Sequence, residues 1–96
     1  MENGKTYGYI VRTPGTCGGK PRIDGHRIRV QDVAILYEQL GNSPDEICDA
    51  FPGITLAQVH AALAYFYDHR QEILEEIEAG IKFAEEFRRQ HPELCR

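Results

Sequence analysis

The chain has 96 residues, which suits one domain with a buried core. Its hydrophobic content of 42% is ordinary for a globular protein, and its formal net charge is −4. No apolar run approaches the roughly 18 residues that a membrane-spanning helix needs, and the polar start of the sequence lacks the apolar centre of a signal peptide. Three cysteines without metal or disulfide spacing favour reduced thiols. We therefore expect a cytoplasmic protein with no membrane contact.

The net charge hides an asymmetry between the two ends of the chain. Residues 1–30 hold six Lys or Arg and two Asp or Glu, which gives +4, whereas residues 31–96 hold five and thirteen, which gives −8. A basic N-terminal segment and an acidic remainder of the chain suggest different partners for the two ends. The alternative is that both sets of charges are solvated surface.

The first 30 residues indicate short strands and a hairpin. Residues 7–12 alternate in a way that favours a strand. Residues 15–21 lack the spacing of a phosphate-binding loop, so a connector or a backbone nest for an anion remains. Asp24-Gly25 predicts a two-residue hairpin turn with Arg22 opposite Arg27. Basic residues cluster in the predicted hairpin and just before it. The candidate nucleic-acid-binding residues are therefore Lys20, Arg22, His26, Arg27 and Arg29.

The next segment, residues 31–40, has the pattern of an amphipathic helix. It begins near Gln31-Asp32, and its expected buried stripe is Val33, Leu36, Tyr37 and Leu40. Gly41 is expected to end it, because glycine readily takes the left-handed conformation that closes a helix.

Residues 41–67 read as two helices joined by a tight turn. Ser43 and Glu46 fit a capping box, with Pro44 at the first helical position. Pro52-Gly53 breaks the first helix and Thr55 is a candidate cap for the second, whose expected buried face is Leu56, Val59, Leu63 and Phe66. This matches a helix-turn-helix, although a plain αα-corner has the same pattern.

A helix-turn-helix reads bases with the start of its second helix, and here that surface is poor in cations. Gln58 could read adenine, but no Lys or Arg appears before Arg70. Phosphate neutralisation supplies much of the affinity for DNA. If DNA is bound, the basic hairpin must therefore supply much of the affinity, and a dimer is needed.

The last third of the chain predicts a long amphipathic helix, with a kink or a new cap at residues 68–71. Its apolar stripe continues to residue 87, and Pro92 stops the pattern. Glycine costs roughly 1 kcal/mol against alanine inside a helix, so Gly80 suggests a close helix contact. We expect this helix to pack on the domain or on a second copy, and its candidate partner or dimer interface is Ile73, Ile77, Gly80, Ile81, Ala84 and Phe87.

Catalytic and metal-binding chemistry is not expected. The four histidines are dispersed, and no two have i, i+4 spacing. The acidic pairs Glu75-Glu76 and Glu85-Glu86 lie on a helix whose other face is apolar, which favours a solvated surface. No nucleophile has a base nearby in the sequence. The sequence predicts no enzyme, no cofactor and no metal site.

These residues carry a family resemblance. The sequence resembles the domain-of-unknown-function family 433 over about residues 10–72, in the run Arg12-x-Pro14-Gly15-x-Cys17-Gly18-Gly19-Lys20-Pro21-Arg22-Ile23-x-Gly25-x-Arg27-Ile28-x-Val30, then Ser43-Pro44-x-Glu46-Ile47, Phe51-Pro52, Leu56 and Ala61-Ala62-Leu63-Ala64-Tyr65. The resemblance implies a small β-hairpin on a homeodomain-like helical domain that is usually homodimeric. It also implies similarity to bacterial antitoxins, which are often encoded beside a PIN-like nuclease. The resemblance implies no catalytic residues.

The sequence thus predicts an α+β, mostly α fold: a short N-terminal β-hairpin followed by a three-to-four-helix bundle with a helix-turn-helix-like unit. We expect one domain, with a hairpin arm (1–30), a helix-turn-helix core (31–68) and a long C-terminal helix (69–90). The expected function is that of an antitoxin-like regulator which binds a PIN-like nuclease and, as a further candidate partner, its own promoter DNA. The alternative is a homo-oligomeric protein-interaction module with no nucleic-acid role.

Overall fold

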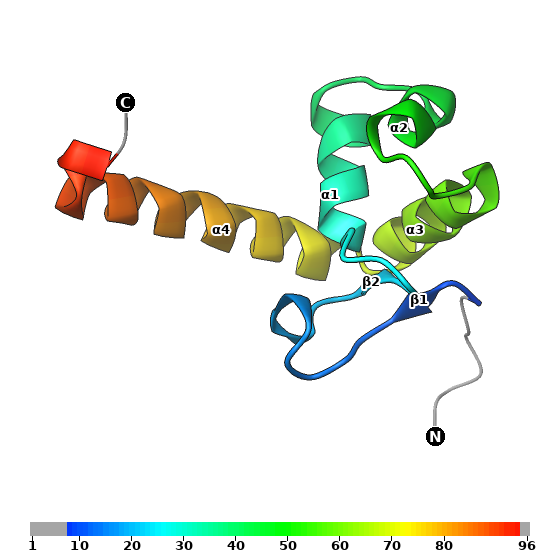
Figure 1. The fold of residues 1–96 in the computed structure, drawn as a ribbon, viewed down its shortest axis with the longest axis horizontal. Coiled ribbons are helices and arrows are strands. Elements are labelled where there is room, and N and C mark those ends of the chain that lie inside the picture. The colour runs from blue at the N-terminus through cyan, green and yellow to red at the C-terminus, as the bar shows by residue number, and fades with distance from the viewer. Residues whose placement is uncertain (1–7, 95–96) are drawn as a thin grey trace.

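The computed structural model describes residues 8–94. Figure 1 shows a helical domain with a small sheet on one side and one long helix that runs outward from it. The predicted mostly helical fold with a short antiparallel sheet near the N-terminus is therefore confirmed. The elements in chain order are β1 (Ile10–Val11), the 3-10 turn η1 (Cys17–Gly19), β2 (Arg22–Ile23), α1 (Val30–Ala34), the π-helical turn η2 (Ile35–Gln39), α2 (Pro44–Ala50), α3 (Leu56–Asp68), α4 (Arg70–Gln90) and the 3-10 turn η3 (Pro92–Leu94).

The sheet pairs β1 with β2, and its register differs in part from the prediction. Ile10 lies opposite Ile23 in an antiparallel ladder. The predicted turn at Asp24-Gly25 is present, because the His26 amide donates to the Ile23 carbonyl at 3.0 Å and Gly25 has a φ of 85°. Arg22, however, pairs with Arg29 across the hairpin. The predicted pairing of Arg22 with Arg27 is therefore wrong, because the Ile23 amide bonds to the Ile28 carbonyl at 2.9 Å and leaves a longer loop between them.

The first helix begins and ends close to the predicted residues, but its last turn is wider than expected. The amide of Leu40 donates to the carbonyl of Ile35 at 3.1 Å, which is the i to i−5 spacing of a π-helical turn. The extra residue in this turn rotates Leu40 out of the stripe, so that it is 65% exposed rather than buried as predicted. Gly41 follows with a φ of 75° and closes the helix as expected.

Both predicted caps of the helix-turn-helix-like unit are present. The Ser43 amide donates to Glu46 Oε1 at 2.8 Å, and the Glu46 amide donates to Ser43 Oγ at 3.2 Å. Thr55 and Gln58 form the same reciprocal pair, at 2.8 and 3.2 Å. Each box satisfies amides that the first helical turn would otherwise leave without an acceptor. These caps fix where α2 and α3 begin.

The hydrophobic core lies where α1, α2 and α3 meet, and it extends to β2 and the start of α4. Leu56 is 43% exposed, so its predicted place on the buried face of α3 is wrong: it is the first residue of the helix and lies at the edge of the core. The other predicted residues of that face are buried. The core consists of Ile23, Val30, Val33, Ala34, Ile47, Ile54, Val59, Ala62, Leu63, Phe66, Ile73 and Ile77.

A new helix begins after His69, which resolves the predicted choice between a kink and a cap. His69 has φ −127° and ψ 40°, values that interrupt the helix between α3 and α4. The first half of α4 packs on α1 and α3, and the second half extends beyond the domain, as Figure 1 shows. Over residues 8–94, no helix is both long and apolar enough to cross a membrane.

Candidate interaction surfaces

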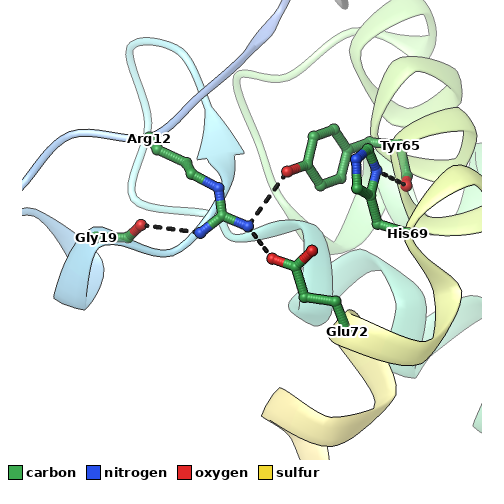
Figure 2. Close-up of polar contacts among 5 residues, drawn as sticks. All are labelled: Arg12, Gly19, Tyr65, His69 and Glu72. Atoms are coloured by element: carbon green, nitrogen blue, oxygen red, sulfur yellow. Dashed lines mark hydrogen bonds and ion pairs between the residues drawn. The ribbon is translucent and has the colours of Figure 1, made fainter.

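A three-way polar junction joins the N-terminal arm to the helices. Arg12 follows β1 and donates from Nη1 to the Gly19 carbonyl and from Nη2 to the Tyr65 hydroxyl, both at 3.3 Å. The same Nη2 forms an ion pair with Glu72 of α4 (Figure 2). The Tyr65 ring stacks on His69, with centroids 4.1 Å apart. Arg12 therefore holds the η1 loop against the point where α3 ends and α4 begins.

Glu76 lies one turn further along α4 in an unfavourable position for a carboxylate. Its Oε1 atom is buried and has no hydrogen-bond partner among the described residues. Burial raises the pKa of Glu76, and the negative charge of Glu72 adds to that, whereas Arg12, Lys20 and Arg29 oppose it. The cations near Glu76 therefore do not offset the loss of water around its carboxyl group.

Two of the five arginine, lysine and histidine residues predicted to bind nucleic acid have structural roles. Arg22 donates from Nη1 to the His26 carbonyl and from Nη2 to Thr13 Oγ1, each at 3.0 Å, and so braces the hairpin turn. Arg29 precedes α1 and binds the Asp32 carboxylate through Nη2 at 2.8 Å and Nε at 3.2 Å. Acceptors within the domain therefore hold and orient both guanidinium groups.

The other three of these residues lie in different surroundings. Arg27 is exposed, and no described residue pairs with its guanidinium group. The half-buried His26 lies against the α2–α3 turn, since its Cε1 atom is 3.6 Å from where a Cβ on Gly53 would be. Lys20 is also half-buried and lines a groove described below. The structure therefore places the hairpin turn beside the helix-turn-helix turn, with Arg27 as its exposed cation.

Gln58, predicted as a base reader, is held by the start of its own helix. Its Oε1 atom accepts the Thr55 amide, so the side chain lies back along the first turn of α3. Ala57 and His60 are the exposed neighbours, and α2 beside them carries exposed Asp45, Glu46 and Asp49. This face of the unit is neutral to acidic, which is unfavourable for phosphate.

The structure divides the predicted partner interface into two parts. Ile73 and Ile77 are buried in the core of this chain, so their assignment to a partner surface is corrected: the half of α4 that carries them packs on α1. Gly80, Ile81 and Phe87 lie beyond the domain and are exposed, and Ala84 is half-buried. Sequence reasoning missed Phe83, which is 72% exposed beside this stripe and packs on Phe87 with ring centroids 6.5 Å apart.

An open groove of about 490 Å³ lies where the domain meets the exposed half of α4. One wall is the exposed stripe of α4, and the other is α1 with its π-helical turn and the basic residues before it. Gln31 is 6% exposed, and its Oε1 atom has no hydrogen-bond partner among the described residues. The groove is lined by Lys20, Arg29, Gln31, Ile35, Gln39, Ile77, Gly80, Ile81 and Ala84.

No metal centre is formed in the described part of the chain. Residues 8–94 contain no group of three or more His, Cys, Asp or Glu that could hold an ion. Cys17 and Cys48 are free thiols, and the predicted third thiol, Cys95, lies outside the described residues.

The fold and these surfaces define a small helical protein with a helix-turn-helix-like unit, a β-structured arm and a projecting helix. The sequence matches the family described as protein of unknown function (DUF433) over residues 10–66, more than half of the chain. The chain belongs to this family. A crystal structure of a DUF433 member from Anabaena variabilis ATCC 29413 is similar, with 36% sequence identity and a TM-score of 0.65 over 73% of this chain and 68% of that one. A search of curated proteins found no match.

Proposed function

We propose that this chain is a small antitoxin-like regulator that binds a PIN-like nuclease through the exposed half of α4. The observation that carries the proposal is Phe83, a large apolar side chain that is 72% exposed on a helix projecting from the domain. Ile81 and Phe87 are exposed beside it. Aromatic side chains gathered on a surface are typical of the anchors of protein–protein interfaces.

The nuclease as the kind of partner rests on the resemblance to antitoxins that the sequence motifs carry. The resemblance to antitoxins came from residues 10–72, which form the domain, whereas α4 projects from that domain and offers a surface to another molecule. A helix that projects from a domain can lie across the surface of an enzyme partner. The C-terminal half of α4 is an element of this kind.

Coexpression with the nuclease encoded beside the gene tests this function. The wild-type chain should relieve the growth arrest that the nuclease causes. Phe83→Glu should fail to do so, because a charge replaces the central apolar anchor. Ala79→Glu is the matched control, since Ala79 is an exposed residue of the same helix outside the groove and the stripe, and it should relieve the arrest like the wild type. Full relief by Phe83→Glu, or a gene with no nuclease beside it, would contradict the proposal.

Promoter DNA is the second candidate partner, and one observation favours it. The exposed Arg27 lies on the hairpin turn that packs beside the α2–α3 turn, through His26 and Gly53. A cation at this position can contact phosphate while the helix-turn-helix-like unit approaches a groove. Since Arg22 and Arg29 bind acceptors of the domain, this DNA contact would depend on Arg27 and Lys20.

The homo-oligomeric module remains the alternative, and Gly80 favours self-association. A Cβ built on Gly80 would meet no atom within 4 Å, so nothing in the described part of the same chain explains a glycine there. Close approach of a second helix would explain it. The two surfaces share Ile81, but Phe83 itself does not line the groove.

A further inference from the structure

The groove beside Gly80 is lined by two cationic side chains that still have N–H groups to donate. Lys20 comes directly after η1, and Arg29 directly precedes α1. The Lys20 ammonium group has no hydrogen-bond or ion-pair partner among the described residues. Asp32 accepts from Nε and Nη2 of Arg29, which leaves Nη1 without an acceptor in the described part of the chain. Both side chains can therefore donate to an anion in the groove.

Gln31 adds an amide nitrogen to these donors. The residue lines the groove although it is only 6% exposed. Its Oε1 atom is buried without a partner, whereas Nε2 is neither buried in this way nor hydrogen-bonded to any described residue. The amide nitrogen is therefore the polar atom of Gln31 that reaches the groove. An unpaired donor in such a place favours a ligand that accepts a hydrogen bond.

Two carboxylates lie near these donors, and neither saturates them. Asp32 engages only part of the Arg29 guanidinium group. Glu76 is within electrostatic reach of Lys20 and Arg29, but its Oε1 atom is buried and makes no hydrogen bond to a described residue. A ligand anion would therefore find free donors, and it would compete with the negative charge of Glu76.

The rest of the groove is a short apolar strip. Ile35 lies one turn after Gln31, and the opposite wall runs along α4 from Ile77 to Ala84, a stretch of about 10 Å in a helix. Gly80 leaves the middle of this wall open, because a Cβ there would meet no atom within 4 Å. The groove volume of about 490 Å³ is in the range of pockets that hold small molecules, roughly 300–1,000 Å³. A slender aliphatic chain fits this strip.

We propose that the groove binds a small amphipathic carboxylic acid of the medium-chain fatty acid type. Its carboxylate accepts hydrogen bonds from Lys20, Arg29 and Gln31 at the polar end. Its aliphatic chain lies in the open space over Gly80, against Ile81. Charge-assisted hydrogen bonds hold the head, and removal of the chain from water adds to the affinity. This site goes beyond the proposed function, because it involves neither Phe83 nor a nuclease.

Titration of the full chain with octanoate, followed by amide NMR, tests the site. Octanoate should shift the amide signals of residues 31–39 and 77–84. It should bind about tenfold more tightly than octanol, which has the same chain length without a carboxylate. Hexanoate should bind several-fold more weakly than octanoate, because each CH₂ group that is fully removed from water contributes about fourfold to the affinity.

Paired variants locate the head and the chain of the ligand. Lys20→Gln should weaken octanoate binding about fivefold to tenfold, whereas Lys82→Gln removes the same charge outside the groove and should have no effect. Gly80→Leu should block the aliphatic chain, and Ala79→Leu, on an exposed residue outside the groove, should not. Glu76→Gln should tighten binding about twofold to fivefold, because a competing negative charge is removed. A variant that fails to fold cannot produce this gain.

Four results would overturn the proposal. These are the absence of octanoate binding at about 1 mM, equal affinity for octanoate and octanol, equal losses in the two lysine variants, and signal shifts confined to the exposed side chains Phe83, Phe87 and Arg88. A dimer that excludes octanoate would assign the groove to a second copy instead. Phe83→Glu should leave octanoate binding intact while it abolishes relief of the growth arrest, so the two proposals fail separately.

Discussion

Arg12 and Glu72, sixty residues apart in sequence, form an ion pair that fastens the N-terminal arm to the first turn of α4. The same guanidinium group reaches the Gly19 carbonyl and the Tyr65 hydroxyl. Four segments of the chain therefore meet at one side chain, as Figure 2 shows. The pairing orients α4 relative to the domain, and with it the groove and the exposed stripe.

Replacing Arg12 should loosen the arm more than it destabilises the domain. Both members of the ion pair are partly exposed, so Arg12→Met should lower the free energy of unfolding by only about 1 kcal/mol. Amide hydrogen exchange in residues 15–20 should become faster, because the Gly19 carbonyl loses its donor. Arg89→Met, which breaks an exposed pair within one helix, is the control and should leave that loop unchanged. Unaltered exchange in the loop of the Arg12 variant would contradict the role of the junction.

Two leucines of α3 should respond very differently to truncation. Leu63 is buried, so Leu63→Ala should cost about 2–5 kcal/mol of stability. Leu56 is 43% exposed on the same helix, so Leu56→Ala should cost less than about 1 kcal/mol. Urea unfolding of the two variants measures the difference. Equal losses would show that the edge of the core lies elsewhere.

Gln58 should act as a helix cap and not as a base reader. Glutamate can accept the Thr55 amide in the same way, so Gln58→Glu should keep the stability within about 0.5 kcal/mol of the wild type.

If the chain binds promoter DNA, Arg27→Ala should reduce the slope of log K against log salt by roughly 0.9 for each phosphate that the variant no longer neutralises. Fluorescence anisotropy at two salt concentrations measures that slope. An unchanged slope in the Arg27 variant would remove the hairpin from DNA binding.

Glu76 should make the stability depend on pH in a direction set by its burial. Because the pKa of Glu76 is raised on folding, the folded state favours the protonated carboxyl group. Its contribution is therefore fully present below the unfolded pKa of about 4.3 and is lost as the pH rises through the higher folded pKa. Glu76→Gln should match the wild type in acid and exceed it in Tm at neutral pH. A variant less stable than the wild type at neutral pH would show that the ionised carboxylate is favoured instead.

Local signals in the sequence predicted the helix ends well. Ser43 with Glu46, Thr55 as a cap, and Gly41 as a terminator each depend on neighbours within a few residues, so short-range chemistry sets them. The wide turn before Leu40 and the pairing of Arg22 with Arg29 depend on how the core packs. The local sequence pattern did not show this, so the predictions that Leu40 is buried and that Arg22 lies opposite Arg27 were wrong.

The candidate surfaces were harder to predict, for a related reason. The apolar stripe of α4 runs without a break from Ile73 to Phe87, and only packing shows that the domain covers it as far as Ile77. The sequence likewise shows that a residue is basic, but it does not show which acceptor its side chain binds. Arg29 and Arg27 look alike in sequence, yet Asp32 holds the first and the second is exposed. Phe83 lies beside the regular stripe, and its exposure follows from where the domain ends.

The most direct test of the proposed function is hydrogen exchange of the chain alone and in complex with the nuclease encoded beside its gene. The exposed half of α4, residues 78–90, should exchange more slowly in the complex, because the nuclease covers Phe83 and Phe87. Phe83→Glu should abolish this protection, whereas Ala79→Glu should retain it. Protection confined to α2, α3 and the hairpin turn, or no protection at all, would contradict the assignment of nuclease binding to α4.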